Sequence, residues 1–155
     1  MVSFKGNEGA LRQRIADLEA KVAALQNEEE RTAIALSNSR VGIFDWQLDV
    51  RRIYVSPILQ DMLGYGAEGM PDNIESWLSL VHSDDQFQAD KEVREALVYG
   101  KKFFQGLYKM NRKDGATRRF LFRAVIMRRS RADGGDASRV LGSAVDITDL
   151  PAILT

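Results

Sequence analysis

No cysteine occurs among the 155 residues, and this absence excludes several kinds of site at once. Without a thiol the chain cannot form a disulfide, a thiolate metal site, a cysteine nucleophile or a cysteine photoadduct. The chain also has a single histidine. Because a zinc or other transition-metal site needs several nitrogen or sulfur ligands, we predict no metal site.

Long hydrophobic runs and an excess of one charge are also missing. No run of eighteen apolar residues occurs, and residues 1–9 lack the apolar core of a signal peptide. Lys plus Arg equal Asp plus Glu at 22 each, so the net charge is zero and no overall field attracts nucleic acid or an anionic membrane. We therefore expect a cytoplasmic protein whose segment here contacts neither membrane nor nucleic acid.

The length and composition fit one folded domain with an additional element. Hydrophobic residues make up 45% of the chain, which is enough for a core. The composition changes near residue 40. We predict a flexible tail over residues 1–9, a helical dimerisation segment over 10–39, a folded domain over 40–149 and a linker stub over 150–155.

The segment 10–39 has the pattern of a coiled coil. It contains neither proline nor glycine and is rich in residues that favour helix. With Ile15 at heptad position a, Arg14 at g and Glu19 at the following e face each other in a parallel dimer. The alternative is an amphipathic helix that folds onto its own domain. The apolar positions that define the predicted seam are Leu11, Ile15, Leu18, Val22, Leu25 and, after a weaker middle, Leu36.

Strand and helix patterns alternate after Arg40. Apolar runs over residues 41–48 and 51–56 predict two strands joined by a short turn. A short helix is expected to start at Pro57, and an apolar helical or irregular stretch follows over 74–81. Ser83, with Gln86 three residues later, predicts a capping box that opens a helix, closed by Gly100. The expected inner residues of that helix are Phe87, Val93, Ala96 and Leu97.

Three longer strands are predicted over residues 102–112, 117–129 and 139–147. Asp114-Gly115 marks a hairpin turn between the first two, and residues 133–136 mark a looser turn before the last. Two strands, short helices and three antiparallel strands form an α+β arrangement: a five-stranded antiparallel sheet flanked by short helices and preceded by a long amphipathic helix.

Several short segments follow one another in a recognisable order: Phe44-Asp45-Trp46, Tyr54-Val55-Ser56-Pro57, Met62-Leu63-Gly64-Tyr65, the run from Trp77 to Asp85, Arg112-Lys113-Asp114-Gly115, and Asp146-Ile147-Thr148. In this order they resemble PAS domains of the PAS-PAC (PAS_3-like) type, and the resemblance covers about residues 41–149. The family usually has proline after the histidine of its central segment, where this chain has Ser83.

The resemblance implies a sensory module rather than an enzyme. Its members bind haem, flavins or metabolites in a pocket between sheet and helices, or bind only proteins. Their N-terminal helix commonly dimerises, and the Asp146-Ile147-Thr148 segment commonly leads into a helix that feeds a histidine kinase or a diguanylate cyclase. The chain itself shows no kinase phospho-acceptor block, nucleotide loop or cyclase motif. We therefore expect a homodimeric sensor of a two-component or related system, and alternatively a pure interaction domain with a filled core.

Aromatic and apolar side chains that share strand faces are the candidates for a pocket, although such residues more often simply fill a core. The cofactor is left unknown: the chain lacks the cysteine of an adduct-forming flavin sensor, and we expect His82 to have a structural or capping role rather than to bind haem. The candidate pocket residues are Phe44, Trp46, Met62, Trp77, Leu80, Tyr108, Met110, Phe120, Phe122 and Ile126.

Arginine and lysine gather in the second half of the domain. Because they alternate along predicted strands in a neutral chain, we expect a solvated outer sheet face or a docking surface for acidic groups rather than a nucleic-acid site. Asp84 and Asp85 are expected to complement a helix dipole rather than to catalyse. The basic residues are Arg112, Lys113, Arg118, Arg119, Arg123, Arg128, Arg129 and Arg131.

Overall fold

The computed structural model describes residues 4–66, 69–129 and 135–150. It divides the chain into two units, residues 1–38 and 39–155. The first is helical and the second contains the sheet. Within the described residues, no helix is both long enough and apolar enough to cross a membrane.

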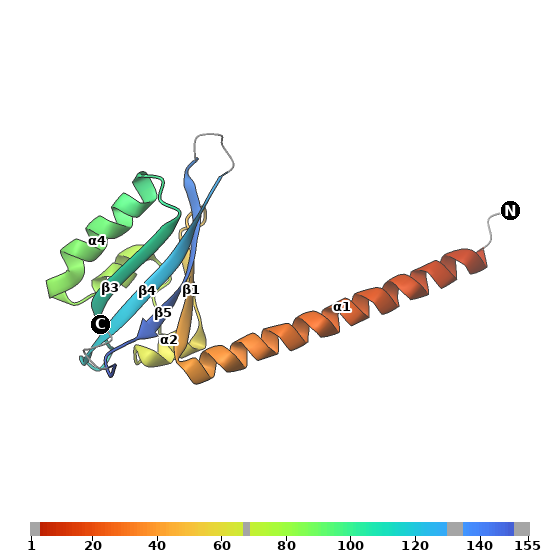
Figure 1. Ribbon diagram of the computed structural model, residues 1–155, viewed down its shortest axis with the longest axis horizontal. Coiled ribbons are helices and arrows are strands. Elements are labelled where there is room, and N and C mark those ends of the chain that lie inside the picture. The colour runs from red at the N-terminus through yellow and green to blue at the C-terminus, as the bar shows by residue number, and fades with distance from the viewer. Residues whose placement is uncertain (1–3, 67–68, 130–134, 151–155) are drawn as a thin grey trace. The chain divides into compact units, whose positions relative to one another are not determined.

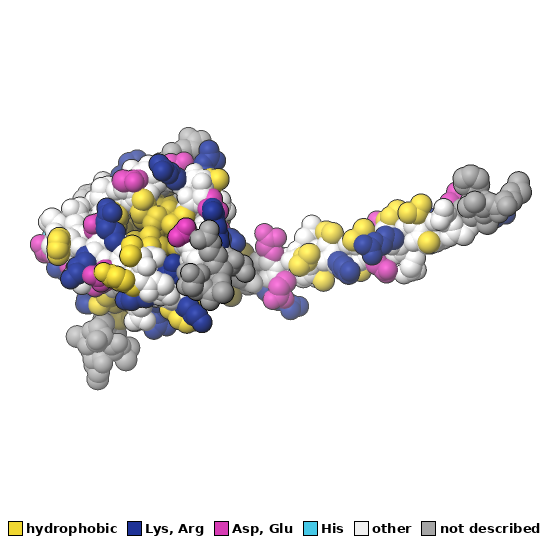
Figure 2. All heavy atoms as spheres, turned by 90° about the horizontal axis from the view of Figure 1, so that it is seen from above, with side chains coloured by type: hydrophobic (Ala, Val, Ile, Leu, Met, Phe, Trp, Pro, Cys, Tyr) yellow, Lys and Arg dark blue, Asp and Glu magenta, His cyan; other side chains and the backbone are white. Residues whose placement is uncertain are grey.

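Helix α1 (Phe4–Ser39) forms one continuous rod (Figure 1). It begins inside the segment that we predicted as a tail. Gly6 and Gly9 each lower helix propensity by only about 1 kcal/mol, and no proline stops the helix from extending across them. Figure 2 shows hydrophobic side chains interleaved with charged ones along this helix. Those exposed by at least 45% include Leu11, Ile15, Leu18, Val22, Leu25 and Ile34, whereas Leu36 is half-buried.

The second unit is built on an antiparallel sheet in the order β2-β1-β5-β4-β3. This five-stranded sheet, with short helices and a long N-terminal helix, confirms the predicted fold class. The predicted 133–134 part of the last turn lies outside the described residues. The strands are β1 (Val41–Gln47), β2 (Arg52–Val55), β3 (Phe103–Asn111), β4 (Thr117–Arg128) and β5 (Ala137–Asp146).

Three helices lie between β2 and β3 in the chain: α2 (Pro57–Met62), α3 (Ile74–Ser79) and α4 (Ser83–Val98). Figure 1 shows α4 running beside β3. Glycines end two of these helices, because Gly64 and Gly100 adopt φ of 81° and 69°, which side chains with a Cβ rarely adopt.

The start of α4 differs from the predicted capping box. The N-cap is His82 rather than Ser83: it has non-helical φ and ψ of −56° and 144°, and its Nδ1 accepts a hydrogen bond of 3.2 Å from the Asp84 amide. Gln86 does not complete a box but donates to the carbonyl of Val81 at 3.0 Å. His82 therefore has the capping role expected of it, one residue earlier than the Ser-x-x-Gln pattern indicated.

The inner face of the sheet packs against the helices. Phe120 is fully buried and lies opposite Tyr108 on the neighbouring strand, so alternation places Phe122, Ala124 and Ile126 on the same face. On α4 the prediction for Phe87 was wrong, since its side chain is 80% exposed. Two residues correspond to about 200° of helix rotation, so Phe87 points away when Ala89 faces the core.

Candidate functional site

A cavity of about 110 Å³ lies between the inner face of the sheet and the helices. It is partly open, and its walls are almost entirely apolar. Figure 2 shows hydrophobic side chains gathered near the middle of the face of this domain that is turned to the viewer. The lining residues are Phe44, Trp46, Ile53, Ile74, Trp77, Leu78, Val81, Ala89, Val93, Leu97, Phe104, Tyr108, Met110, Phe122, Ile126 and Val140.

Most of the predicted pocket residues do line this cavity. Met62, Leu80 and Phe120 do not: Met62 and Phe120 are 1% and 0% exposed in the solid core, and Leu80 packs against that core. These three side chains point toward the core, as the sequence pattern predicts, but they pack tightly there and do not border the cavity. The predicted residues on the wall are Phe44, Trp46, Trp77, Tyr108, Met110, Phe122 and Ile126.

Helix α4 supplies wall residues that the pocket prediction missed. Ala89, Val93 and Leu97 recur every four residues, so they form one stripe along the helix. Val93 and Leu97 were expected as inner residues of this helix, but they were not assigned to the pocket. The other missed residues come from β2, α3, the strands and the bridge before α4: Ile53, Ile74, Leu78, Val81, Phe104 and Val140.

Two polar groups at the cavity wall, on Tyr108 and Trp77, already have protein partners. The Tyr108 hydroxyl donates a hydrogen bond to the Glu92 carboxylate on α4. The indole N–H of Trp77 donates to the carbonyl of Pro71 at 3.0 Å. Burial, followed by the hydrogen bond to Glu92, raises the pKa of Tyr108 above that of a free tyrosine, so the phenol remains a donor. Neither group is free to bind a ligand without giving up a protein partner.

Neither haem nor a flavin fits this cavity. Pockets for such large ligands enclose about 300–1,000 Å³, well above the space present. The wall also offers no cationic side chain for propionates or phosphates, and His82 is not among the lining residues. The chemistry of the wall therefore argues against both groups.

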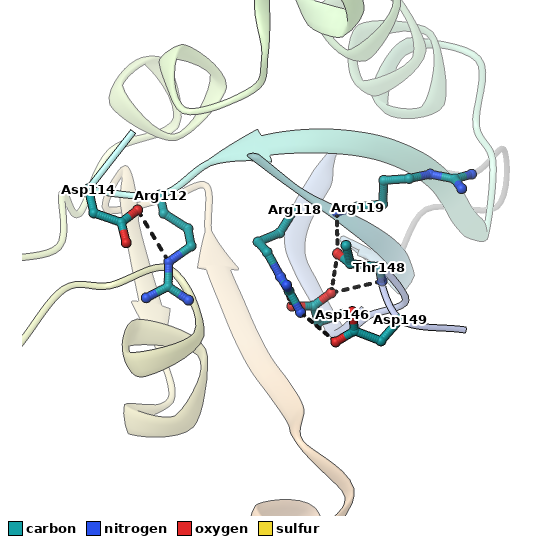
Figure 3. Close-up of polar contacts among 7 residues, drawn as sticks. All are labelled: Arg112, Asp114, Arg118, Arg119, Asp146, Thr148 and Asp149. Carbon is teal, nitrogen blue, oxygen red and sulfur yellow. Dashed lines mark hydrogen bonds and ion pairs between the residues drawn. The ribbon is translucent and has the colours of Figure 1, made fainter. Parts of the chain in front are cut away.

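A second polar cluster fixes the segment after β5 to the start of β4 (Figure 3). Arg118 Nε donates to Asp146 Oδ2 at 2.8 Å, and its Nη2 donates to Asp149 Oδ2 at 3.0 Å. The Thr148 hydroxyl donates to Asp146 Oδ1 at 2.6 Å and accepts from the Arg119 amide at 2.8 Å. The Ile147 amide donates to the Arg119 carbonyl, and the Ile147 side chain is buried.

The charge of Asp146 is stabilised by this cluster. Burial is the largest single influence and on its own raises the pKa of Asp146. Hydrogen bonds from Thr148 and from Arg118 together outweigh burial, so the pKa of Asp146 lies below its ordinary value. The carboxylate is therefore ionised at neutral pH and joins β5, β4 and the following turn.

The sequence matches the PAS_3 family, described as the PAS fold, over residues 52–143. The chain belongs to this family. The match extends from β2 into β5, and the resemblance seen in the sequence is thereby confirmed. No curated protein matches the chain.

Solved structures share the fold of the PAS domain. A sensory box histidine kinase/response regulator from Burkholderia thailandensis E264 is 24% identical, with 77% of this chain and 86% of that chain covered and a TM-score of 0.62. The N-terminal domain of a diguanylate cyclase with a PAS/PAC sensor from Marinobacter aquaeolei is 17% identical, with 70% and 95% covered and a TM-score of 0.61. The LOV domain of the blue-light photoreceptor aureochrome 1 is 19% identical, with 74% and 88% covered and a TM-score of 0.57.

The basic residues of the PAS domain are mostly engaged within the fold. Arg128 donates to the carbonyls of Ala96, Leu97 and Lys101 at the end of α4, so it does not belong to a solvated outer face. Arg118 is held by Asp146 and Asp149, Arg129 pairs with Asp49, and Arg112 pairs with Asp114 at 3.5 Å (Figure 3). Arg131 lies outside the described residues. Within residues 4–66, 69–129 and 135–150, no group of three His, Asp or Glu could hold a metal ion.

Proposed function

We propose that this chain is the sensory module of a bacterial-type signalling protein that dimerises through α1 and relays binding of a ligand or partner to an effector. The observation that carries the proposal is the direct joining of two units. Helix α1 ends at Ser39 and β1 begins at Val41, so a single residue separates a dimerisation helix from the sheet of a PAS domain. In this proposal, a change in the sheet reaches the helix across this one-residue connection.

The exposed stripe of α1 supports the dimer. Leu11 and Leu25 at d positions are 62% and 69% exposed, and Ile15 and Val22 at a positions are 53% and 51% exposed. A stripe of this kind on a polar helix calls for an apolar partner. A second copy supplies one, because the same a and d positions interlock as knobs and holes.

The cluster at Asp146 supports the relay. Strand β4 lines the cavity with Phe122 and Ile126, and Arg118 at its start holds Asp146 and Asp149. An occupant that favours one position of β4 therefore also favours one arrangement of the output junction, Asp146-Ile147-Thr148. The energy for such a shift comes from the difference in the occupant's affinity for the two arrangements.

A histidine kinase or a diguanylate cyclase is the effector class that we propose. The support is that PAS domains of both classes share this fold at TM-scores of 0.62 and 0.61. The parent gene tests this point: we expect catalytic motifs of one of these classes after the codon for Thr155. A stop codon at that position would remove the covalent effector and leave a partner chain as the target.

The dimer is tested by the double variant Leu18→Asp, Val22→Asp. Two buried carboxylates in the seam cannot be paired, so we expect the mass measured by light scattering to fall from dimer to monomer. Ala20→Asp, Asn27→Asp adds the same charge at f positions on the opposite side of the helix and should leave the dimer intact. An unchanged mass in the seam variant would refute the coiled coil.

The outer face of the sheet favours a second candidate, a protein-interaction domain. Phe103, Val125 and Leu141 are direct neighbours across three strands, and Phe103 and Val125 are 70% and 44% exposed. Val125→Lys together with Leu107→Lys should then abolish capture of partner proteins, while Phe87→Lys together with Val98→Lys, at exposed apolar positions of α4, should not. Equal capture by all variants would exclude this face as the docking surface.

A further inference from the structure

The cavity in the PAS domain defines the kind of molecule that can occupy it. Resting on the proposed sensory function, we propose that the ligand is a small, uncharged, largely hydrocarbon molecule of about the size of one aromatic ring. The volume of the cavity, the chemistry of its wall and the elements that it joins define this ligand class.

The volume sets the size of the ligand. The cavity has about 110 Å³ of space, whereas an engineered apolar cavity of about 150 Å³ in another protein binds benzene. A single ring or a short alkyl chain is therefore the largest occupant that the wall admits with small side-chain shifts. Haem, flavins and nucleotides need several times this space.

The wall sets the polarity of the ligand. Its residues carry no ionisable group other than the Tyr108 phenol, which is engaged with Glu92. A carboxylate, phosphate or ammonium group placed here would lose its hydration without gaining a partner, which strongly disfavours a charged ligand. An apolar molecule gives up no hydrogen bonds with water on entry and gains contacts with atoms that now border empty space.

The position of the cavity gives the occupant a route to the output. It touches α4 through Ala89 and Val93, and the sheet through Phe122 and Ile126. Both tryptophans of the chain, Trp46 and Trp77, are also in the wall. Their two indole signals therefore report on occupancy directly.

Benzene, benzoate and naphthalene form a matched set of probes. We expect benzene to shift both indole N–H signals in NMR spectra of the whole chain and to raise Tm by about 4 °C at ten times its Kd. Benzoate adds one charge to the same ring and should bind at least tenfold more weakly. Naphthalene adds a second ring and should also bind at least tenfold more weakly. Equal binding of benzoate, or no shift with benzene, would overturn the assignment.

Variants on α4 locate the binding site. Ala89→Val fills the cavity and should weaken benzene binding at least tenfold. Ala96→Val is the control, because Ala96 is equally buried on the same helix but is not part of the wall. Should Ala96→Val impair folding, Ile126→Val provides a second test: it enlarges the cavity and should strengthen naphthalene binding. Benzene binding unchanged by Ala89→Val would refute the site.

These outcomes are separable from the proposed function. The dimer mass of the seam variants is measured without any ligand and does not depend on the cavity. A dimer that depends on Leu18 and Val22 but binds no benzene would overturn the ligand class alone. If the seam variant keeps the parent's mass but the chain binds benzene, the proposed coiled coil is refuted and the ligand class is retained.

Discussion

The Tyr108 hydroxyl donates a hydrogen bond to the Glu92 carboxylate, and this contact joins β3 to α4 at the wall of the cavity. Tyr108 is only 6% exposed, so its hydroxyl has little access to water when Glu92 is absent. Glu92 lies between Lys91 and Val93, one residue from the cavity stripe of α4. This hydrogen bond therefore connects α4 to the sheet beside the cavity, where a bound ligand would push the two elements apart.

Tyr108→Phe should lower the free energy of unfolding by about 1–2 kcal/mol. The change removes a charge-assisted hydrogen bond, while half-buried Glu92 recovers part of the loss from water. Urea unfolding followed by circular dichroism measures the difference. Tyr54→Phe is the matched control, since Tyr54 is 59% exposed, and should change stability by less than about 0.5 kcal/mol. Equal losses in the two variants would show that the contact with Glu92 does not stabilise the fold.

Gly142→Ala should destabilise the PAS domain by about 3 kcal/mol, at the upper end for overpacking. Gly142 lies in the middle of the sheet, opposite Phe44 and Ala124. A methyl group there would lie 2.7 Å from the Phe44 ring and 2.8 Å from the Ala124 Cβ, and would clash with the Arg123 carbonyl. Gly66→Ala, where no atom lies within 4 Å, is the control. A thermal melt in which both variants match the parent would contradict the packing described for Gly142.

Acid should destabilise the domain partly through Asp146. Its pKa is lower in the folded chain than in the unfolded chain, so its stabilisation is present above about pH 3.9 and is lost as the pH falls through the folded pKa. Asp146→Asn should therefore show a smaller drop in unfolding free energy between pH 7 and pH 3 than the parent. The control Asp61→Asn changes an exposed carboxylate on α2 and should keep the parent's pH dependence. A parent-like drop in Asp146→Asn would show that this carboxylate is not held in its charged form.

The sequence predicted the fold well because its signals are local. Strand alternation and the Asp114-Gly115 turn depend on neighbouring residues, and the strands appear within about two residues of their expected bounds. The cap of α4 was misplaced because histidine is not among the usual N-cap residues, whereas serine is. Residues 4–9 were predicted as a tail, but they are helical because glycine lowers helix propensity only slightly.

The site was predictable only in part, because how deeply a side chain lies within the domain does not depend on neighbouring residues alone. Alternation shows that Phe120 and Phe122 point inward, yet only strand register places Phe120 in solid core and Phe122 at the cavity. The Arg118–Asp146 pair joins residues 28 apart in the chain. No spacing rule on a single element predicts a pair of this kind. The contacts of Arg128 with the end of α4 are of the same non-local type.

Arg128→Met should cost about 1.5–3 kcal/mol and loosen the last turn of α4. The Arg128 guanidinium donates to the carbonyls of Leu97 at 3.0 Å and Ala96 at 2.9 Å, which have no further helical turn to bind. It also places a positive charge at the negative end of the helix. Methionine keeps the side chain's bulk but loses these bonds, so amide hydrogen exchange should speed up at Val98 and Tyr99 and not at the start of α4. Arg129→Met is the control, because Arg129 is 63% exposed in its pair with Asp49 and such pairs contribute at most about 1 kcal/mol. If both variants lose the same free energy of unfolding, and amide hydrogen exchange at the end of α4 is equally fast in both, Arg128 does not cap the helix.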